Sequence, residues 1–170
     1  MSEVLPTDKR KPIGIAILTV SDTRTAANDK SGDVIEELAR AAGHLIQVRQ
    51  ICSDERDSIE SVMDRWLQDG SIEAIVITGG TGIGLRDVTI ETVTPYFTKP
   101  IDGFGELFRF LSYTEDVGSK AMLSRATAGG IGEKALFALP GSSKAVKLAM
   151  EKLIVPELHH IVYELTKHRL

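Results

Sequence analysis

The sequence contains a single cysteine, Cys52, and no apolar run that approaches the length of a membrane span. One cysteine cannot form an internal disulfide, so we expect a reducing, cytoplasmic location. The first residues, MSEVLPTDKRKP, carry no apolar signal-peptide core, which argues against secretion or anchoring by that route. We therefore predict a mobile polar tail over residues 1–12, a single domain over residues 13–170 and no membrane partner.

An excess of positive charge is also absent, because the formal net charge is −4. A chain with this charge has no global attraction for nucleic acid, so we predict no nucleic-acid partner. Any anionic ligand must then be held by local groups.

Several common catalytic motifs are missing. The chain has no G-x-S-x-G segment of the kind that presents a hydrolase serine. The glycine-rich segment TGGTGIGLRD lacks both the Gly-Lys-Ser/Thr of a P-loop and the third glycine of a dinucleotide fingerprint. The histidines show no zinc-binding spacing, and we expect solvated or interface positions for His44, His159, His160 and His168.

The first half of the chain alternates between apolar runs and amphipathic helical patterns. The apolar runs predict strands over residues 13–21, 44–52 and 72–78. Apolar residues at helical spacing predict helices over residues 33–43 and 53–70. The order β-α-β-α-β implies a parallel sheet with helices on its faces and right-handed crossovers.

The second half is less regular. We predict a short helix over residues 89–97, interrupted near Pro95, and a helix over residues 103–113 with one apolar face formed by Phe104, Leu107, Phe108 and Leu111. Residues 125–141 indicate two strands around a glycine-rich turn, and residues 142–167 indicate a helix that Pro156 kinks or divides. The expected fold class is α/β, with a mostly parallel sheet and a small hairpin-like antiparallel element in the second half.

Four polar clusters follow the predicted strands. In open parallel α/β sheets, ligands bind beyond the carboxyl ends of the strands. Here those ends carry TVSDTR at residues 19–24, SDERD at residues 53–57, TGGTG at residues 78–82 and LPGSSK at residues 139–144. Each cluster alone is a weak signal, but four at one edge of one sheet predict a binding site.

The TGGTG cluster has the composition of an anion site. Glycines let backbone N–H groups approach a ligand, and several inward N–H groups make a nest for phosphate, although a plain tight turn is the alternative. Asp54 and Asp87 are candidates to hold Mg²⁺, an ion commonly bound by one or two carboxylates together with substrate phosphates. The alternatives are that Asp54 caps the second helix and that Asp87 serves the N-terminus of the next one.

Hydroxyl and cationic groups complete the expected site. Ser142 or Ser143 can cap the last helix, where free N–H groups attract anions. Lys144 either faces a bound anion or is solvated, and Arg125, after Ser124, is either solvated or reaches a phosphate.

The motifs LTVSDTR, TGGTG…RDVT, GFGE, LSRA and LPGSSKA, in this order, closely resemble those of the molybdopterin adenylyltransferase family of molybdenum cofactor biosynthesis, MogA and MoaB. The resemblance covers nearly the whole chain and is closer to the MoaB branch. It implies a three-layer α/β/α domain that binds molybdopterin and forms homotrimers or homohexamers. It also implies Mg²⁺-dependent adenylyl transfer, in which the terminal phosphate of molybdopterin attacks the α-phosphate of ATP and pyrophosphate leaves. The product would then pass to the molybdate-inserting protein.

The same resemblance implies which residues form the site. Asp54 and Asp87 are expected to be catalytic and to bind the metal, although Ser53 stands where the family's motif has a proline. Substrate or nucleotide binding is expected from the other motif positions, namely Thr19, Ser21, Asp22, Gly79, Gly80, Thr81, Gly82, Arg86, Glu106, Ser124, Arg125, Pro140, Gly141, Ser142 and Lys144. The alternatives are a non-catalytic molybdopterin-binding or carrier protein and a scaffold subunit, neither of which requires the carboxylate pair.

Overall fold

A six-stranded sheet forms the centre of the computed structural model, which describes residues 10–170. Most of the predicted N-terminal tail, residues 1–9, lies outside the described residues. The strand order is β2-β1-β3-β6-β5-β4, with β1 (Gly14–Val20), β2 (Leu45–Cys52), β3 (Ala74–Thr78), β4 (Lys99–Pro100), β5 (Thr127–Ile131) and β6 (Lys134–Leu139).

The pairing of the strands confirms the predicted α/β sheet. Strands β2, β1, β3 and β6 are parallel, and β5 pairs antiparallel with both β6 and β4. The β5–β6 pair is the antiparallel hairpin expected in the second half. Strand β4 was not predicted, because two residues are too short to carry an apolar pattern.

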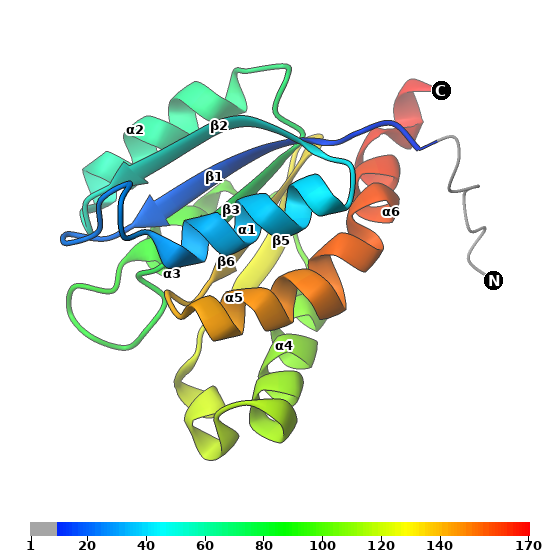
Figure 1. The fold of residues 1–170 in the computed structure, drawn as a ribbon. Helices are drawn as coiled ribbons and strands as arrows, with labels where there is room; N and C mark the ends of the chain where they lie inside the picture. The colour runs from blue at the N-terminus through cyan, green and yellow to red at the C-terminus, as the bar shows by residue number, and fades with distance from the viewer. Residues whose placement is uncertain (1–9) are drawn as a thin grey trace.

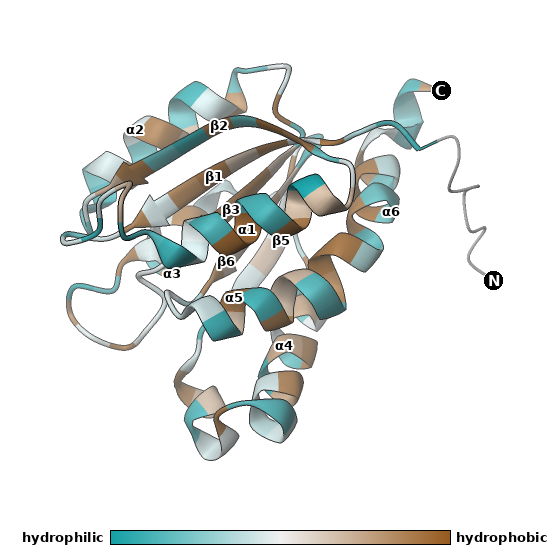
Figure 2. Ribbon diagram, in the orientation of Figure 1, coloured by the Kyte–Doolittle hydropathy of each residue, from teal (hydrophilic) through white to brown (hydrophobic). Residues whose placement is uncertain are grey.

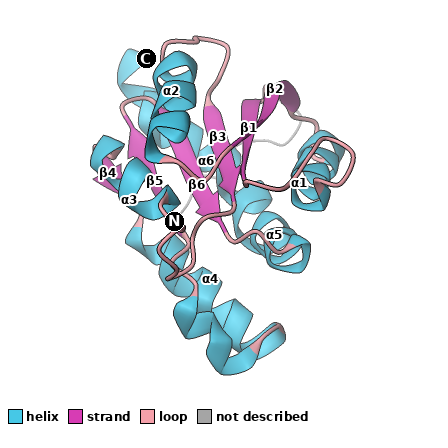
Figure 3. Ribbon diagram, turned by 90° about the vertical axis from the view of Figure 1, so that its left-hand side faces the viewer, coloured by secondary structure: helices cyan, strands magenta, loops and turns pink. Residues whose placement is uncertain are grey.

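Helices cover both faces of the sheet and make three layers (Figures 1 and 3). One face carries α1 (Lys30–Ala41), α4 (Asp102–Glu115), α5 (Ser143–Ala149) and α6 (Val155–Thr166). The other face carries α2 (Arg56–Leu67) and α3 (Thr89–Val93). Short 3₁₀ segments lie at Thr94–Tyr96, Gly118–Leu123 and Lys167–Arg169. Within residues 10–170, no helix has both the length and the apolar character needed to span a bilayer.

Two apolar cores lie on the two sides of the sheet, and β1 contributes to both. Ile15 and Ile17 belong to the core that contains side chains of α1 and α5, while Ala16 and Leu18 belong to the core beneath α2. Full burial of one large aliphatic side chain contributes about 1.5–3 kcal/mol. Burial on both faces explains why β1 is a continuous apolar run rather than an alternating one. Figure 2 shows these central strands in brown and the outward faces of the helices largely in teal.

Only part of the predicted apolar face of helix α4 is buried. Phe104, Phe108 and Ser112 are buried, whereas Leu107 is 54% exposed. The buried residues are spaced by four, and Phe104 packs against Phe137 of β6 with ring centroids 5.5 Å apart. Leu107 lies at the border of the predicted apolar face, one position before Phe108, and the sheet leaves it largely exposed.

Pro156 lies in the first turn of α6, and the C-terminal helical region is divided there. A π-helical segment, Met150–Ile154, joins α5 to α6. Proline has no N–H to donate to the carbonyl four residues earlier, and the wider π turns accommodate the missing hydrogen bond.

His44 is buried, so the prediction of a solvated or interface position is wrong for this histidine. It is 4% exposed, and its Nδ1 accepts a hydrogen bond of 3.1 Å from the backbone N–H of Ile13. The ring of His159 lies 4.8 Å away, centroid to centroid. Burial, together with the nearby His159, lowers the pKa of His44 from 6.5 to about 4.

The lowered pKa of His44 predicts a pH-dependent stability. The unfolded chain binds a proton at His44 that the folded chain excludes between about pH 6.5 and pH 4, so the free energy of unfolding should fall as the pH decreases through that window. In His44→Gln, this part of the decrease should be absent. Urea unfolding at pH 7 and pH 4.5 measures the change in the free energy of unfolding between the two pH values, and His160→Gln, at an exposed histidine, is the control. If this change were the same for His44→Gln and the unchanged protein, the assignment to His44 would be wrong.

Candidate functional site

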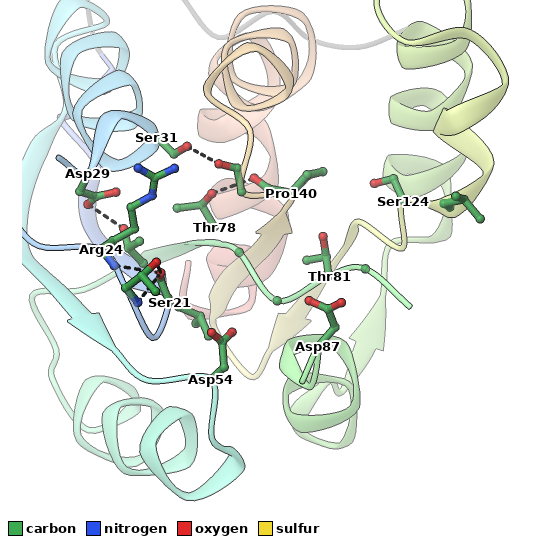
Figure 4. Close-up of a pocket in the computed structure, with 18 residues that line it drawn as sticks. Ser21, Arg24, Asp29, Ser31, Asp54, Thr78, Thr81, Asp87, Ser124 and Pro140 are labelled. Atoms are coloured by element: carbon green, nitrogen blue, oxygen red, sulfur yellow. Dashed lines mark hydrogen bonds between the residues drawn. The ribbon is translucent and has the colours of Figure 1, made fainter. Parts of the chain in front are cut away.

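A cavity of about 550 Å³ lies at the carboxyl edge of the sheet, where the segments after β1, β2, β3 and β6 meet (Figure 4). The structure therefore brings together residues from all four polar clusters. Of the residues expected in the site, those that line the cavity are Thr19, Ser21, Asp54, Gly79, Gly80, Thr81, Gly82, Asp87, Ser124, Pro140 and Gly141. Those that do not line it are Asp22, Arg86, Glu106, Arg125, Ser142 and Lys144.

The glycine loop after β3 is a tightly held turn. Gly79 and Gly80 adopt φ values of +100° and +70°, which side-chain-bearing residues rarely adopt. The N–H of Gly79 donates to the carbonyl of Leu139 at 2.9 Å. The buried hydroxyl of Thr89 donates to the Gly79 carbonyl at 2.8 Å, and the Thr89 N–H donates to the Gly80 carbonyl at 3.1 Å. The threonine of RDVT thus fixes the loop against the start of α3.

The loop after β1 contributes residues that the motif assignment missed. Asp29 is 1% exposed, caps α1 by accepting from the N–H of Gly32, and accepts from the Thr19 hydroxyl at 2.8 Å. Arg49 of β2 lies 3.0 Å from the Asp29 carboxylate and compensates its charge. Asp29 before the apolar periodicity of α1 is an N-cap signal that could have placed the helix start at residue 30. Val20, Thr23, Arg24 and Thr78 also line the cavity, and they belong to the predicted clusters at residues 19–24 and 78–82 although no individual role was assigned to them. The remaining lining residues, Ser31 and Leu123, were not predicted.

Asp54 and Asp87 extend their carboxylates into the cavity from two different loops (Figure 4). Asp54 Oδ2 accepts from the N–H of Asp22 at 3.0 Å, and Asp87 Oδ2 accepts from the N–H of Gly84 at 2.9 Å. Within residues 10–170, neither Oδ1 has a hydrogen-bond donor. Asp54 does not cap α2, because the N-cap position is Glu55 and no side-chain capping bond is present there.

The environment of Asp54 opposes its ionisation. Burial raises the pKa of Asp54, and the negative charges of Asp22 and Asp87 raise it further, against the hydrogen bond from Asp22 and the charge of Arg86. By contrast, hydrogen bonds from the Asp54 backbone and from Arg86 lower the pKa of Asp22. Asp22 is therefore a stable anion that orders the Asp54 loop, through a hydrogen bond of 2.9 Å from the Asp54 N–H.

The three expected cations of the site are all held in ion pairs outside the cavity. Arg86 lies 2.7 Å from Asp22 and 2.9 Å from Glu55, and it links the loops after β1, β2 and β3. Lys144 lies 3.1 Å from Asp116 with its side chain 74% exposed, which agrees with the predicted alternative of a solvated lysine rather than one that faces the cavity. Arg125 pairs with Glu91 and donates to the Gly82 carbonyl at 3.0 Å, so it supports the glycine loop from behind.

Three expected hydroxyl and carboxyl groups have distinct surroundings. Ser142 Oγ caps α5 by accepting from the N–H of Ala145. Glu106 is exposed on α4 and does not reach the cavity. Ser124 Oγ is the only buried side-chain polar atom of the described residues without a hydrogen-bond partner. Because buried polar groups are normally paired, this hydroxyl on the cavity wall indicates a position that a ligand can satisfy.

Comparison with known proteins identifies the family. Residues 16–160 match the family model described as "Probable molybdopterin binding domain". The chain belongs to this family. It is 52% identical over 159 residues to molybdenum cofactor biosynthesis protein B of Staphylococcus carnosus, covering 92% of this chain and 93% of the relative.

Solved structures support the same relationship and the MoaB branch. A crystal structure of molybdenum cofactor biosynthesis protein B matches with a TM-score of 0.90 at 50% identity, covering 95% of this chain and 99% of that one. A structure of MogA matches with a TM-score of 0.77 at 26% identity, covering 89% of this chain and 99% of that one. The three-layer α/β/α fold implied by the resemblance is therefore confirmed.

The donor groups that face the cavity bear on whether a metal ion can bind there. Within residues 10–170, no group of three or more His, Cys, Asp or Glu residues is placed to hold one. The cavity instead offers the free oxygens of Asp54 and Asp87, two hard ligands with several positions left for other donors. Mg²⁺ typically binds through one or two carboxylates, with water and substrate phosphates as the remaining ligands. The residues fit a magnesium ion that arrives with a phosphate-bearing ligand.

Proposed function

We propose that this protein acts in molybdenum cofactor biosynthesis as a molybdopterin adenylyltransferase that uses ATP and Mg²⁺. The observation that carries the proposal is the pair of carboxylates, Asp54 and Asp87, in one cavity with a glycine loop between them. A pterin-binding surface alone requires no such pair. Family membership and the names of the similar proteins support the pathway.

The proposed reaction joins a phosphate oxygen of molybdopterin to the α-phosphorus of ATP and breaks the bond between that phosphorus and the oxygen of the departing pyrophosphate. Such transfers depend on positioning and on charge stabilisation rather than on a protein nucleophile. Bound magnesium would neutralise phosphate charge next to Asp54 and Asp87. The chain's own contribution would be the glycine loop, whose positive φ values suit a phosphate nest, and the unpaired hydroxyl of Ser124.

The oligomeric state and the partners extend this proposal. We propose a cytoplasmic homotrimer or homohexamer that hands its product to the molybdate-inserting protein, as the family resemblance implies. Exposed apolar side chains on α4 support self-association, since Leu107, Phe110 and Tyr113 are each more than half exposed.

A direct assay tests the proposed activity. Purified protein with molybdopterin, ATP and Mg²⁺ should produce adenylated molybdopterin and pyrophosphate in equal amounts, both measurable by chromatography. Omitting any one of the three additions should abolish both products. Tight binding of molybdopterin without product would contradict the proposed adenylyltransferase activity and would favour a non-catalytic carrier protein.

A further inference from the structure

Arg24 is the only cationic residue among the described residues that line the cavity. It follows β1 in the loop that leads to α1, and Figure 4 shows its guanidinium directed toward Ser31 and the turn at Pro140. Arg86, Arg125 and Lys144, the three basic residues to which a binding role was assigned from the motifs, lie outside the lining. A phosphate-bearing ligand in this cavity therefore has one arginine side chain within reach.

The guanidinium of Arg24 retains most of its hydrogen-bonding capacity. Its one side-chain bond is a long contact of 3.4 Å from an N–H to the backbone carbonyl of Asn28. No carboxylate among residues 10–170 lies within ion-pair distance of it, unlike the guanidinium groups of Arg49, Arg86 and Arg125. Arginine presents five donors in a planar fork that matches phosphate oxygens, so this group is available for an oxyanion.

The backbone around Arg24 is ordered by local hydrogen bonds. Ser21 Oγ accepts from the N–H groups of Thr23 and Arg24 at 3.2 and 3.1 Å. Asn28 Oδ1 accepts from the N–H of Thr25 at 2.8 Å, which closes the remainder of the loop. Because the backbone of this loop is already ordered, binding a ligand costs it little further conformational entropy.

The charges of the cavity are separated along its length. Asp54 and Asp87 form an acidic end, while the third lining carboxylate, Asp29, is neutralised by Arg49. In Figure 4 the guanidinium of Arg24 lies beside Ser31 and points away from both carboxylates of the acidic end. A ligand phosphate is attracted to the Arg24 end and repelled by the acidic end unless a cation lies between them.

We propose that Arg24 binds a phosphate group of the ligand and so sets its direction in the cavity. The proposal rests on the proposed function in that the ligand carries phosphate, but it does not require adenylyl transfer. The phosphate belongs either to the polyphosphate of a nucleotide or to the terminal phosphate of molybdopterin, and these two sources share the same chemistry.

Equilibrium binding of both ligands tests the role of Arg24. Mg²⁺-ATP and molybdopterin are titrated separately into the unchanged protein, Arg24→Gln, Arg24→Lys and Arg65→Gln by calorimetry. Arg65 is exposed on α2, outside the cavity, so Arg65→Gln removes the same charge elsewhere. Arg24→Gln should lower the affinity for at least one ligand by about tenfold to a hundredfold, the range for a lost hydrogen bond to a charged group. Arg24→Lys should weaken it less, and Arg65→Gln should stay within about twofold.

The ligand that loses affinity identifies the source of the phosphate. Loss for ATP alone assigns Arg24 to the polyphosphate, and loss for molybdopterin alone assigns it to the terminal phosphate of the pterin. The proposal would be overturned if Arg24→Gln bound both ligands with affinities within about twofold of those of the unchanged protein. It would also be overturned if the unchanged protein bound neither ligand. Weakened binding in a protein that makes no adenylated product would reject the transferase and leave the role of Arg24 intact.

Discussion

Replacing Asp87 with asparagine should lower kcat for adenylated molybdopterin on the order of 100- to 1000-fold, the usual loss when one group that stabilises transition-state charge is removed. The Kd for molybdopterin should change by less than about threefold, since the charge acts mainly in the transfer step. Asparagine is nearly isosteric and keeps an oxygen that can accept from the N–H of Gly84, so the loop geometry is retained. The negative charge at the free oxygen is lost.

The measurement separates turnover from binding. Steady-state product formation gives kcat, and fluorescence titration with molybdopterin gives Kd for the same preparations. Asp102→Asn is the matched control, because Asp102 is exposed in the first turn of α4 and does not line the cavity. If Asp87→Asn lost molybdopterin affinity while turnover per bound substrate was unchanged, Asp87 would be a binding residue and the proposed catalytic role would be wrong.

Gly79→Ala should destabilise the folded protein by at least about 3 kcal/mol, because backbone strain and steric overlap act together at this position. A Cβ at residue 79 would stand 2.3 Å from the carbonyl oxygen of Val20, the last residue of the buried strand β1. That oxygen belongs to the backbone of a buried strand and cannot move aside as a flexible side chain could. The positive φ adds the strain of a left-handed conformation.

Gly43→Ala separates the two contributions. Gly43 has a φ of +88°, but a Cβ there would meet nothing within 4 Å. The free energy of unfolding of Gly43→Ala should therefore fall by only about 1–2 kcal/mol, the strain that a side chain adds in the left-handed conformation. Urea unfolding of the two variants gives the difference directly. Equal losses for Gly79→Ala and Gly43→Ala would show that the glycine loop does not approach β1 as closely as the structure has it.

The central part of the fold was predictable from local patterns. The runs that form β1 and β3 are buried at every position and almost wholly apolar, and such runs are typical of strands in a parallel sheet between two helix layers. The predictions were incomplete where an apolar pattern was very short or where it did not show which apolar residues of a helix are buried. Strand β4 has two residues, and the apolar residues of α4 outnumber the positions that its contact with the sheet can bury.

The candidate site was likewise predictable in part. Strand order and direction bring the four polar clusters to one edge, so the backbone groups of the glycine loop and the carboxylates of Asp54 and Asp87 were locatable from the sequence. The sequence did not show which basic side chains face the cavity. Arg86 is paired with Asp22, 64 positions away, and Lys144 is paired with Asp116, although each occupies a motif that suggested a ligand.

What the sequence by itself determined is the layer architecture, the edge at which the site lies and the residue types available there, because these follow from local periodicity and chain order. Only the tertiary structure decided which charges remain free for a ligand. A long basic side chain pairs with whichever carboxylate the folded loops bring within a few ångströms, and that neighbour is distant in the chain. Arg86, Arg125 and Lys144 are each paired with a carboxylate outside the cavity, and among residues 10–170 Arg24 is the one basic residue that lines it.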